Sequence, residues 1–523
     1  MKTNPIIISL AHNYHDSCIS LSFGNEIIAS LECERIFRAK KICASPAQME
    51  LAVSFILKRF NLNISDIDYF ILGALNNPYS ETTSFEDISE FKINFQGRKI
   101  PALIIRHHLA HAGFYYCSPF NDALIVSCDG GGDLGERIAY FEGKGQNIKR
   151  VNAEFDNHIS TKPYGQFSSF LYNEPFSEGK LMALASYGAE DMKLNERVEA
   201  VFPLLKNVTF REGQNILNKH FPEFSNTIIS DFDKAAQLAS SVQKVFIAKR
   251  LSNISDIYNK SLSKNIVLVG GSALNLACNS EIYNRISKNI YIPPCCDDTG
   301  IAIGQNAVAI SYLLNKRAKC NLPYVGVGDN EFEVQRLKRS NKNNFDIVDC
   351  PNIAARKLFE GKICISHINR PEVGPRALGH RSFLLGANNK NNKQIISEII
   401  KKREWYRPVA PIVLEEDLEK YFSGGPNKSE YMLFSYEMKK GIKELFPAIN
   451  HFDNTARIQT INQDNCKYMF NLLTEYKRLS GSSILINTSL NLKNEPLSNF
   501  LWDTYNIARK IHFPSFIFQT PNT

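Results

Sequence analysis

Two histidines four residues apart, His107 and His111, are the first side chains in this chain whose spacing suits a chemical role. On a helix this spacing places both imidazoles on one face, about one turn apart, where they can bind one metal ion. The apolar run 123–126 then leads to Asp129, at the end of a predicted strand, where a carboxylate can complete such a site. The alternative is that the histidines are surface or capping residues and that the Asp-Gly-Gly-Gly sequence is a turn.

Arginines in the last third of the chain form a second candidate site. They lie on predicted loops rich in Gly and Pro, beside apolar strands: Arg370, Arg376, Arg381, Arg403, Arg407 and Arg457. A guanidinium group binds carboxylates and phosphates through paired hydrogen bonds, so the set favours an anionic ligand. The alternative is that all six form internal salt bridges, with Glu372 and Glu404 as partners for some of them.

Glycine-rich turns between predicted strands and helices could present backbone N–H groups to an anion. They are 130–132, which follows Asp129, and 270–271, which follows the strand IVLV. Lys180, near a predicted helix N-terminus, either reaches a phosphate or is exposed to solvent. The polar loop with His15 faces phosphates, faces an acceptor hydroxyl, or is only a turn. Neither the P-loop pattern nor G-x-G-x-x-G is present, so the sequence supports neither a Walker ATPase nor a Rossmann dehydrogenase.

Strand–polar loop–helix units must position these residues. The pattern of residues 6–40 predicts a strand, a loop, a hairpin at Gly24-Asn25 and a charged turn. The density of charge in this turn indicates either a buried ion-pair network or the edge of a substrate site. Helices are predicted at 46–62 and 234–262 and a strand at 66–75. Repeated units with acids or glycines at strand ends indicate a duplicated α/β fold with a nucleotide between its halves. The composition becomes polar and basic over 316–343, and the segment RLKRSNKNN (336–344) predicts a surface linker near a domain boundary.

Composition sets limits on the class of protein. A chain of 523 residues predicts two domains, and 44% hydrophobic with 22% charged residues is typical of a soluble globular protein. The net charge of +8 comes from scattered lysines and does not indicate a nucleic-acid surface. The N-terminal apolar run is too short for a signal peptide, and no run approaches the ~20 residues of a membrane helix. Twelve dispersed cysteines without a C-x-x-C pair predict a reducing cytoplasm.

A series of motifs occurs in one order along the chain: HHLAHA, a strand-end DG, EGKLMALASYG, GGSALN, DDTGIAIGQ, GPRALGHRS, KKRExxRPVAP, TARIQT and NTSLN. With them the sequence resembles the O-carbamoyltransferases of the nodulation-factor and antibiotic-tailoring type. Some positions depart from the family pattern, for example Gly379-His380-Arg381-Ser382 in place of GNRS. None of the departures removes a charged functional residue.

The resemblance implies an α/β chain of two domains. Residues 1–345 are expected to form an actin-like (ASKHA, duplicated ribonuclease-H-like) domain, and residues 346–523 a YrdC-like twisted α/β domain. The second domain is expected to make carbamoyl-adenylate from carbamoyl phosphate and ATP, with Mg as the usual companion of ATP. The first domain is expected to transfer the carbamoyl group to a hydroxyl of a small molecule, a sugar or a natural product. Nucleic acid and membrane are not expected partners, and a homodimer is compatible with the resemblance.

The resemblance also implies residue roles. The metal ligands are His107, His111, Asp129 and Asp298, with Asp297 as the competitor of Asp298, which is preferred because Thr299-Gly300 follow it. The catalytic residues are His15, as the base for the acceptor hydroxyl, with Lys401 and Arg407. The adenylation pocket comprises Arg376, Lys401, Arg407, Arg457, Asn487 and Ser489. The nucleotide-binding residues are Gly130, Gly131, Lys180, Gly270, Gly271, Asn275 and Asn279.

Several alternatives stay open from the sequence. Two imidazoles and two carboxylates suit Fe(II), Mn(II) and Zn(II), with Fe(II) as the first expectation. The acceptor and the oligomeric state are not determined. A threonylcarbamoyl-type tRNA modification enzyme and a non-catalytic nucleotide-binding scaffold are the competing functions.

Overall fold

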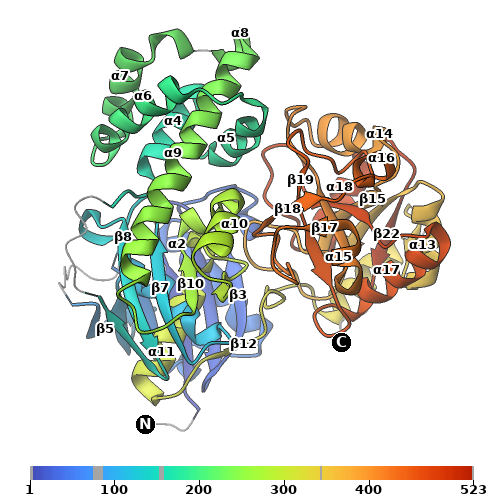
Figure 1. The fold of residues 1–523 in the computed structure, drawn as a ribbon. Helices are drawn as coiled ribbons and strands as arrows, with labels where there is room; N and C mark the ends of the chain where they lie inside the picture. Colours follow the sequence, from blue (N-terminus) through green and yellow to red (C-terminus); the bar gives the residue numbers. More distant parts are fainter. Residues whose placement is uncertain (1–3, 75–85, 152–157, 226, 342–343, 521–523) are drawn as a thin grey trace.

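The first sheet belongs to the N-terminal half of the chain. The computed structural model describes residues 4–74, 86–151, 158–225, 227–341 and 344–520 (Figure 1). The sheet has the strand order β12-β3-β2-β1-β4-β6-β5. Its strands are β1 (Ile6–Ala11), β2 (Cys18–Phe23), β3 (Glu26–Glu32), β4 (Tyr69–Gly73), β5 (Ile88–Phe95), β6 (Arg98–Ile105) and β12 (Lys319–Cys320). β1 pairs antiparallel with β2 and parallel with β4, β2 pairs antiparallel with β3, and β4 pairs parallel with β6.

The second sheet repeats this pattern. Its order is β11-β10-β7-β8-β9. Its strands are β7 (Asp122–Cys128), β8 (Ile138–Lys144), β9 (Asn147–Arg150), β10 (Ile266–Val269) and β11 (Ile290–Tyr291). β7 pairs antiparallel with β8 and parallel with β10, as β1 does with β2 and β4. β8 pairs antiparallel with β9, as β2 does with β3, and β10 pairs parallel with β11, as β4 does with β6. Two copies of one strand order confirm the duplicated, actin-like fold of this domain.

Two helices lie between the sheets and position the histidines. They are α3 (His107–Ala112) and α11 (Ile301–Leu314), which share one buried core with residues of both sheets. The helices touch backbone to backbone, because a Cβ added at Gly304 would lie 1.9 Å from the carbonyl oxygen of Ala110. A Cβ at Gly113 would lie 2.2 Å from the oxygen of Gly304. Glycine at both positions therefore sets the depth of the histidine helix in the domain.

Most of the remaining helices of this half form a group at one end of the long helix α9, away from the sheets (Figure 1). The group consists of α4 (Lys162–Tyr172), α5 (Glu178–Leu184), α6 (Met192–Val201), α7 (Phe210–His220) and α8 (Thr227–Ser230). The other helices of this half include α1 (Cys33–Phe37), α2 (Pro46–Arg59), α9 (Phe232–Tyr258) and α10 (Leu276–Arg285), of which α2 and α10 lie beside the sheets. α9 is one continuous helix of 27 residues, where the sequence predicted several. Its buried Ala, Ser and Val side chains let α4, α5 and α6 pack closely on it.

The C-terminal half folds around a mixed sheet of order β13-β22-β14-β15-β21-β16-β20, beside a small sheet of order β17-β18-β19. The strands are β13 (Ile347–Val348), β14 (Ile363–His367), β15 (Arg381–Gly386), β16 (Ala410–Leu414), β17 (Phe422–Ser423), β18 (Ser435–Met438), β19 (Thr455–Arg457), β20 (Gln459–Ile461), β21 (Leu485–Ser489) and β22 (Ser515–Gln519). The helices are α13 (Pro351–Phe359), α14 (Asn391–Lys393), α15 (Leu418–Tyr421), α16 (Ile442–Leu445), α17 (Lys467–Ser480) and α18 (Leu501–Arg509). The mixed sheet with its helices confirms the α/β class expected for this half, and its YrdC-like identity remains a prediction. The boundary at residue 345 remains a prediction.

The predicted linker is a helix instead. α12 (Glu331–Asn341) contains the first six residues of the predicted linker segment, 336–341, and packs against α18. Val334 is buried and Leu337 packs against the core, while Glu333 forms an ion pair with Arg59 at 2.6 Å. Two apolar side chains three positions apart give the segment one buried stripe, which its overall polar composition conceals.

A buried ion pair joins the two halves of the chain. Arg35 donates to Glu32 through Nε at 3.0 Å and Nη2 at 2.8 Å, as the predicted ion-pair network requires. The same guanidinium donates to the carbonyl oxygens of Glu372, at 2.5 Å, and Gly374, at 2.8 Å. The N–H of Gly374 donates in turn to Glu32 at 2.8 Å. This pair therefore fixes the position of the loop 372–374 of the second domain against β3 and α1.

Replacing Arg35 by alanine should destabilise the protein strongly, because the substitution leaves the Glu32 carboxylate buried without its partner. We expect a loss of about 3–5 kcal/mol in the free energy of unfolding. Urea unfolding followed by circular dichroism measures this loss. Arg285→Ala is the matched control, since Arg285 is 68% exposed where it meets Glu281, and should cost no more than about 1 kcal/mol. Equal effects of the two substitutions would contradict this role of the pair.

Candidate active site

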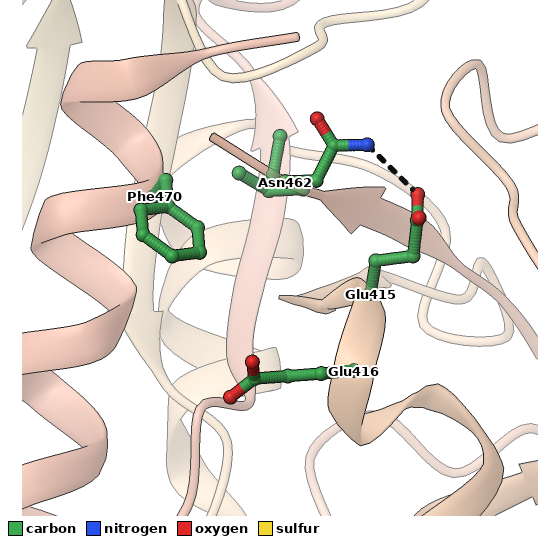
Figure 2. A pocket seen from close by; sticks show the side chains of 5 residues that line it. Glu415, Glu416, Asn462 and Phe470 are labelled. Atoms are coloured by element: carbon green, nitrogen blue, oxygen red, sulfur yellow. Dashed lines mark hydrogen bonds between the residues drawn. The ribbon is translucent and has the colours of Figure 1, made fainter. Parts of the chain in front are cut away.

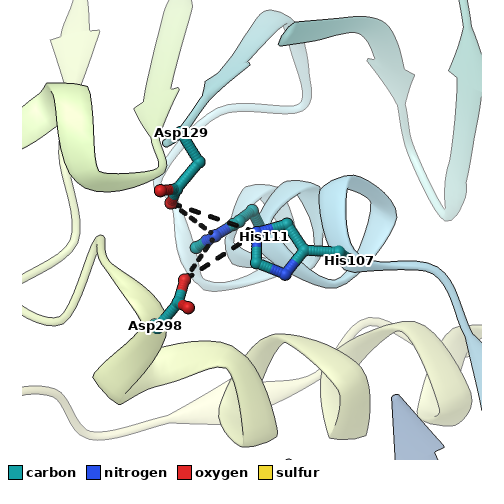
Figure 3. Close-up of side chains that lie close together, drawn as sticks. All are labelled: His107, His111, Asp129 and Asp298. Atoms are coloured by element: carbon teal, nitrogen blue, oxygen red, sulfur yellow. Dashed lines mark ion pairs between the residues drawn. The ribbon is translucent and has the colours of Figure 1, made fainter. Parts of the chain in front are cut away.

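Four side chains from three segments converge at the end of α3. His107 and His111 lie on α3, Asp129 follows β7, and Asp298 begins the short turn before α11 (Figure 3). His111 Nε2 lies 3.2 Å from Asp129 Oδ2 and 3.3 Å from Asp298 Oδ1. His107 Nε2 lies 4.0 Å and 3.8 Å from the same two oxygens. The four potential ligand atoms all lie within 4.8 Å of one another.

The donor set fits a divalent cation. Tetrahedral ligands about 2.1 Å from a metal lie about 3.4 Å apart, which is close to these spacings. His107 Nε2, His111 Nε2 and Asp298 Oδ1 are buried and have no hydrogen-bond partner among the described residues, and a bound ion would satisfy all three. Burial lowers the pKa of His111, but the carboxylates of Asp129 and Asp298 beside its Nε2 outweigh this effect and raise that pKa to about 9. The carboxylates therefore favour a positive charge at this point.

Surrounding groups hold these ligands in place. The carboxylate of Asp129 accepts hydrogen bonds from the N–H groups of Gly130 at 2.5 Å and Gly271 at 2.9 Å. His108 turns away from the cluster and hydrogen-bonds Ser127 Oγ through Nδ1 at 2.7 Å. Two of the predicted phosphate-binding glycines thus orient a carboxylate instead. Phosphate contact through the remaining N–H groups stays a prediction.

Asp297, the competitor for the metal role, lies outside the four-residue cluster. Its carboxylate accepts a hydrogen bond from Thr299 Oγ1 at 2.5 Å. Burial raises its pKa to about 6, against the opposing charge of Lys41. Among the described residues, the geometry favours Asp298 as the ligand.

His15 lies beside the metal cluster. Its Nδ1 is 2.9 Å from Asp16 Oδ2 and 3.8 Å from Asp298 Oδ2. Asp16 also forms an ion pair with Lys41 at 2.5 Å. Burial lowers the pKa of His15, but the hydrogen bond to Asp16 and the charges of Asp298 and Asp16 outweigh it and raise that pKa to about 9. The side chain is 31% exposed, so a substrate hydroxyl can reach a histidine whose ring is oriented by a carboxylate.

Five cations lie together in the second domain. They are Arg376, Lys401, Arg403, Arg407 and Arg457. Burial, and then repulsion from the neighbouring cations, lowers the pKa of Lys401, Arg403 and Arg457. The Nε atoms of Arg376 and Arg457 are buried without a hydrogen-bond partner among the described residues. A protein holds cations in this way where an anion completes the site.

The partners of this cation cluster are mostly neutral. Lys401 Nζ donates to Ser489 Oγ at 2.8 Å and to Asn491 Oδ1 at 2.6 Å. Arg407 lies 3.7 Å from Glu404, the one carboxylate that the structure pairs with the five. Asn487, which was predicted in the same pocket, donates to Gln459 Oε1 at 2.6 Å. Positive charge therefore exceeds negative charge in the described part of this pocket.

Two adjacent lysines of the first domain face the two sites. Lys41 forms the ion pair with Asp16 beside His15. Burial lowers the pKa of Lys40, and Arg403 and Arg407 of the cation cluster lower it further. Sequence analysis placed Lys40 only in a charged turn and gave Lys41 no role. The sole local signal was the run of charge that follows the third strand.

Arg370 and Arg381 are structural, so the prediction that they bind an anionic ligand is wrong. Arg370 donates to the carbonyl oxygens of Ile28 at 2.7 Å and Val325 at 2.6 Å. Arg381 is fully buried and donates only to main-chain carbonyl oxygens, those of Asn499, Ile368, His380 and Asn369. Main-chain acceptors from neighbouring segments satisfy these two guanidinium groups, and the sequence gives no sign of them.

Lys180, Asn275 and Asn279 also have protein partners. Lys180 Nζ pairs with Glu174 and, at 2.9 Å, with Glu404 of the second domain. Asn275 caps α10 and hydrogen-bonds Gln243. Asn279 donates to the carbonyl oxygens of Ala273, at 2.8 Å, and Leu433, at 2.9 Å. Their contact with a nucleotide remains a prediction.

A pocket of about 330 Å³ lies on another part of the second domain (Figure 2). Glu415, Glu416, Ile461, Asn462 and Phe470 line it, and Asn462 Nδ2 donates to Glu415 Oε2 at 3.1 Å. None of these residues belongs to the cation cluster or to the His/Asp cluster. Its two carboxylates would repel phosphate groups, so it does not suit carbamoyl phosphate or ATP.

Loss of one ligand should abolish tight metal binding. We expect His107→Ala to weaken affinity for a divalent ion at least about 10-fold, since losing a single supporting group already has that effect. Asp297→Asn should retain wild-type metal content because Asp297 lies outside the cluster. Metal analysis after dialysis against a weak chelator measures both. If Asp297→Asn lost the metal and Asp298→Asn retained it, Asp297 would be the ligand in place of Asp298.

Replacing Arg457 by methionine should stabilise the free protein while weakening its affinity for polyphosphate. Removing one buried cation from like-charged neighbours should raise the free energy of unfolding by about 1 kcal/mol. Pyrophosphate should raise the melting temperature of the wild type and have little effect on the variant. Thermal unfolding with and without pyrophosphate tests this, with the 67% exposed Arg478 replaced by methionine as the control. An equal pyrophosphate effect in all three proteins would argue against an anion site.

Comparison with known proteins places the chain in a family. Residues 74–307 match the family described as the carbamoyltransferase N-terminus, and residues 355–520 match the carbamoyltransferase C-terminus. Nodulation protein U of Rhizobium tropici is 30% identical over 91% of this chain and 89% of its own length. Nodulation protein NolNO of Sinorhizobium fredii is 27% identical over 94% of this chain and 76% of its own length.

Comparison with solved structures gives only distant matches. A HypF structure in a phosphate- and nucleotide-bound form covers 61% of this chain and 48% of that chain, with 13% identity and a TM-score of 0.36. At that score the likeness carries no argument about function. No helix among the described residues is long and apolar enough to cross a membrane.

Both family halves match in their expected order over most of the sequence, and the protein therefore belongs to the carbamoyltransferase family of enzymes.

Proposed function

We propose that the protein is an ATP-dependent O-carbamoyltransferase that forms carbamoyl-adenylate in its second domain and transfers the carbamoyl group in its first. The observation that carries the proposal is the presence of two buried, chemically opposite sites in one chain. One is a cation cluster with little counter-charge, and the other is a His/Asp cluster with a histidine beside it. Membership of the carbamoyltransferase family supports the same reaction.

The cation cluster suits the activation step. Water splits carbamoyl phosphate into carbamate and phosphate, and a carbamate oxygen then attacks the α-phosphorus of ATP. The new O–P bond replaces the bond to the β-phosphate, and pyrophosphate leaves as the Mg complex. Arg376, Arg407 and Arg457 offset the charge that gathers on the phosphate oxygens during this attack. Lys401, fixed by Ser489 and Asn491, presents one more cation to the carbamate.

The His/Asp cluster suits the transfer step. His15 can act as the base only in its neutral form, and a divalent cation at Asp298 would favour that form by offsetting the carboxylate charge that raises its pKa. Neutral His15 accepts the proton of the acceptor hydroxyl while the hydroxyl oxygen attacks the carbamoyl carbon, and the bond from that carbon to the phosphate oxygen breaks to release AMP. Asp16 orients the imidazole of His15, and Lys41 offsets the charge of Asp16. A divalent ion held by the four cluster residues would supply Lewis acidity toward the phosphate of the intermediate. We propose Fe(II) for this ion, with Mn(II) and Zn(II) as the alternatives.

A protected path between the sites would preserve the intermediate, because a carbamoyl-adenylate hydrolyses readily in water. Lys40 and Lys41 are consecutive, one near the cation cluster and one beside His15. The Glu32–Arg35 pair anchors the loop 372–374 beside them. We propose that the intermediate passes along this seam, and that the acceptor is an alcohol on a small molecule such as a sugar or a natural product.

The defining experiment supplies carbamoyl phosphate and ATP to the metal-loaded protein. Pyrophosphate should form, and mass spectrometry should detect candidate alcohols that gain one carbamoyl group. Absence of pyrophosphate with every acceptor tried would reject the proposal. Pyrophosphate without a carbamoylated product would leave the activation step standing and reject the transfer step.

Two substitutions should separate the steps. Arg407→Ala should lower pyrophosphate formation at least about 100-fold through lost charge stabilisation, while transfer from supplied carbamoyl-adenylate survives. His107→Ala should keep pyrophosphate formation and lose transfer. Colorimetric pyrophosphate detection and mass spectrometry measure the two steps, and exposed Arg478→Ala serves as the control. Loss of the same step in both variants would contradict the two-site scheme.

A further inference from the structure

Phe176 is an exposed aromatic residue that packs against His15. The ring centroids of the two side chains lie 5.0 Å apart, with an interplanar angle of 73°. Lys41 Nζ lies over the same phenyl ring, 5.5 Å from its centroid. Phe176 is nevertheless 52% exposed, so about half of the side chain stays open to solvent beside His15. Neither the sequence motifs nor the proposed reaction gives this residue a role.

The backbone around His15 is held in an unfavourable conformation. Phe176 has φ +58°, Lys41 has φ +58° and Asp16 has φ +56°. This is the left-handed region, which side chains other than glycine avoid, and a bulky phenylalanine is especially disfavoured there. All three residues contact one another or His15. Local strain of this kind collects at functional sites, where the surrounding structure maintains it.

The turn that carries Phe176 is anchored on both sides. It connects α4 to α5, and Ser177 Oγ donates to the main-chain and side-chain oxygens of Glu174, both at 3.2 Å. Glu174 is also paired with Lys180, which reaches Glu404 of the second domain. The ring of Phe176 is thus fixed in position although half of it is exposed. Fixed, exposed aromatic groups with few rotatable bonds bind ligands at a low cost in conformational entropy.

We propose that Phe176 is an acceptor-binding residue, against whose ring a hydroxylated ring of the acceptor packs so that one hydroxyl reaches His15. This proposal rests on the proposed function of His15. C–H groups on the face of a saturated ring carry slight positive charge and are attracted to the negative face of a phenyl ring. Nearby charges are already paired, Lys41 with Asp16 and Lys180 with Glu174, which favours an uncharged, polyhydroxylated ring.

Binding of methyl β-D-glucopyranoside tests the proposal, with sorbitol as the acyclic ligand of similar hydroxyl content. Saturation-transfer NMR is measured on the metal-loaded protein. Phe176→Gly removes the ring and suits the left-handed backbone, and Phe176→Tyr retains the ring. Phe210→Ala is the control, since Phe210 is 47% exposed and lies elsewhere, at the start of α7.

The expected result is a signal from the glucoside with the wild type, Phe176→Tyr and Phe210→Ala. Phe176→Gly should bind it about 3- to 10-fold more weakly, the range for one aromatic contact. Sorbitol should give little signal with any of them. No signal with the wild type, or an equal signal with Phe176→Gly, would overturn the proposal. Equal binding of the glucoside and sorbitol by the wild type would overturn the proposal as well.

Pyrophosphate release separates this proposal from the overall function. Phe176→Gly should form pyrophosphate from carbamoyl phosphate and ATP at the wild-type rate, because the cation cluster is unchanged. Phe176→Gly could instead release pyrophosphate faster than the wild type in the absence of an acceptor while binding the glucoside equally well. That result would mean that Phe176 excludes water from the intermediate, and it would overturn the binding role. A wild type that forms no pyrophosphate would reject the proposed function, whatever the NMR result.

Discussion

Buried charge with too little counter-charge is the constraint on which the rest of this structure depends. Three partly buried arginines and a buried lysine lie together in the second domain, and their mutual repulsion adds to the cost of burial. In the first domain, two carboxylates face two buried imidazoles whose Nε2 atoms lack hydrogen-bond partners among the described residues. Such arrangements cost free energy in a protein without ligands. They persist only where surrounding packing holds them and a ligand completes them.

The duplicated fold provides that packing for the first domain. Two sheets of the same strand order enclose α3 and α11, and the Gly113–Gly304 contact lets the helices approach at backbone distance. This approach brings the start of α11, with Asp298, next to the imidazoles of α3. A methyl group at either glycine would collide with a carbonyl oxygen and displace one side of the cluster. The geometry of the His/Asp cluster is therefore a property of the domain core.

The seam between the domains determines how the two clusters face each other. Arg35 donates to Glu32 and to two main-chain carbonyls of the opposite domain, so one guanidinium group serves as both an ion-pair partner and an interdomain contact. Lys40 and Lys41, a few residues further on, approach opposite sites. On the other side, Lys180 and Glu404 join the helical group to the loop of Arg407. The first domain therefore contributes Lys40 and Lys180 to the surroundings of the cation cluster.

The sequence by itself determined several of the strands and helices and the types of residue that carry the chemistry. A spacing of four residues sets His107 and His111 on one helix face, because the helix period is local and independent of the rest of the chain. The strand-end position of Asp129 is also a local signal. The polar segment before β13 misled the prediction, because only two apolar side chains, Val334 and Leu337, mark its buried face.

The tertiary structure decided which of many similar residues face a site. Arg376 and Arg457 each have a buried Nε atom with no hydrogen-bond partner in the part of the chain that the structure describes, whereas main-chain oxygens of other segments satisfy Arg370 and Arg381. Their sequence contexts are alike, so no local pattern separates them. Lys41 and Phe176 escaped prediction for the same reason, since each meets His15 only through folding of remote parts of the chain. Local periodicity follows from covalent geometry, but the choice of partners depends on which backbone acceptors and charges the fold brings within hydrogen-bonding distance.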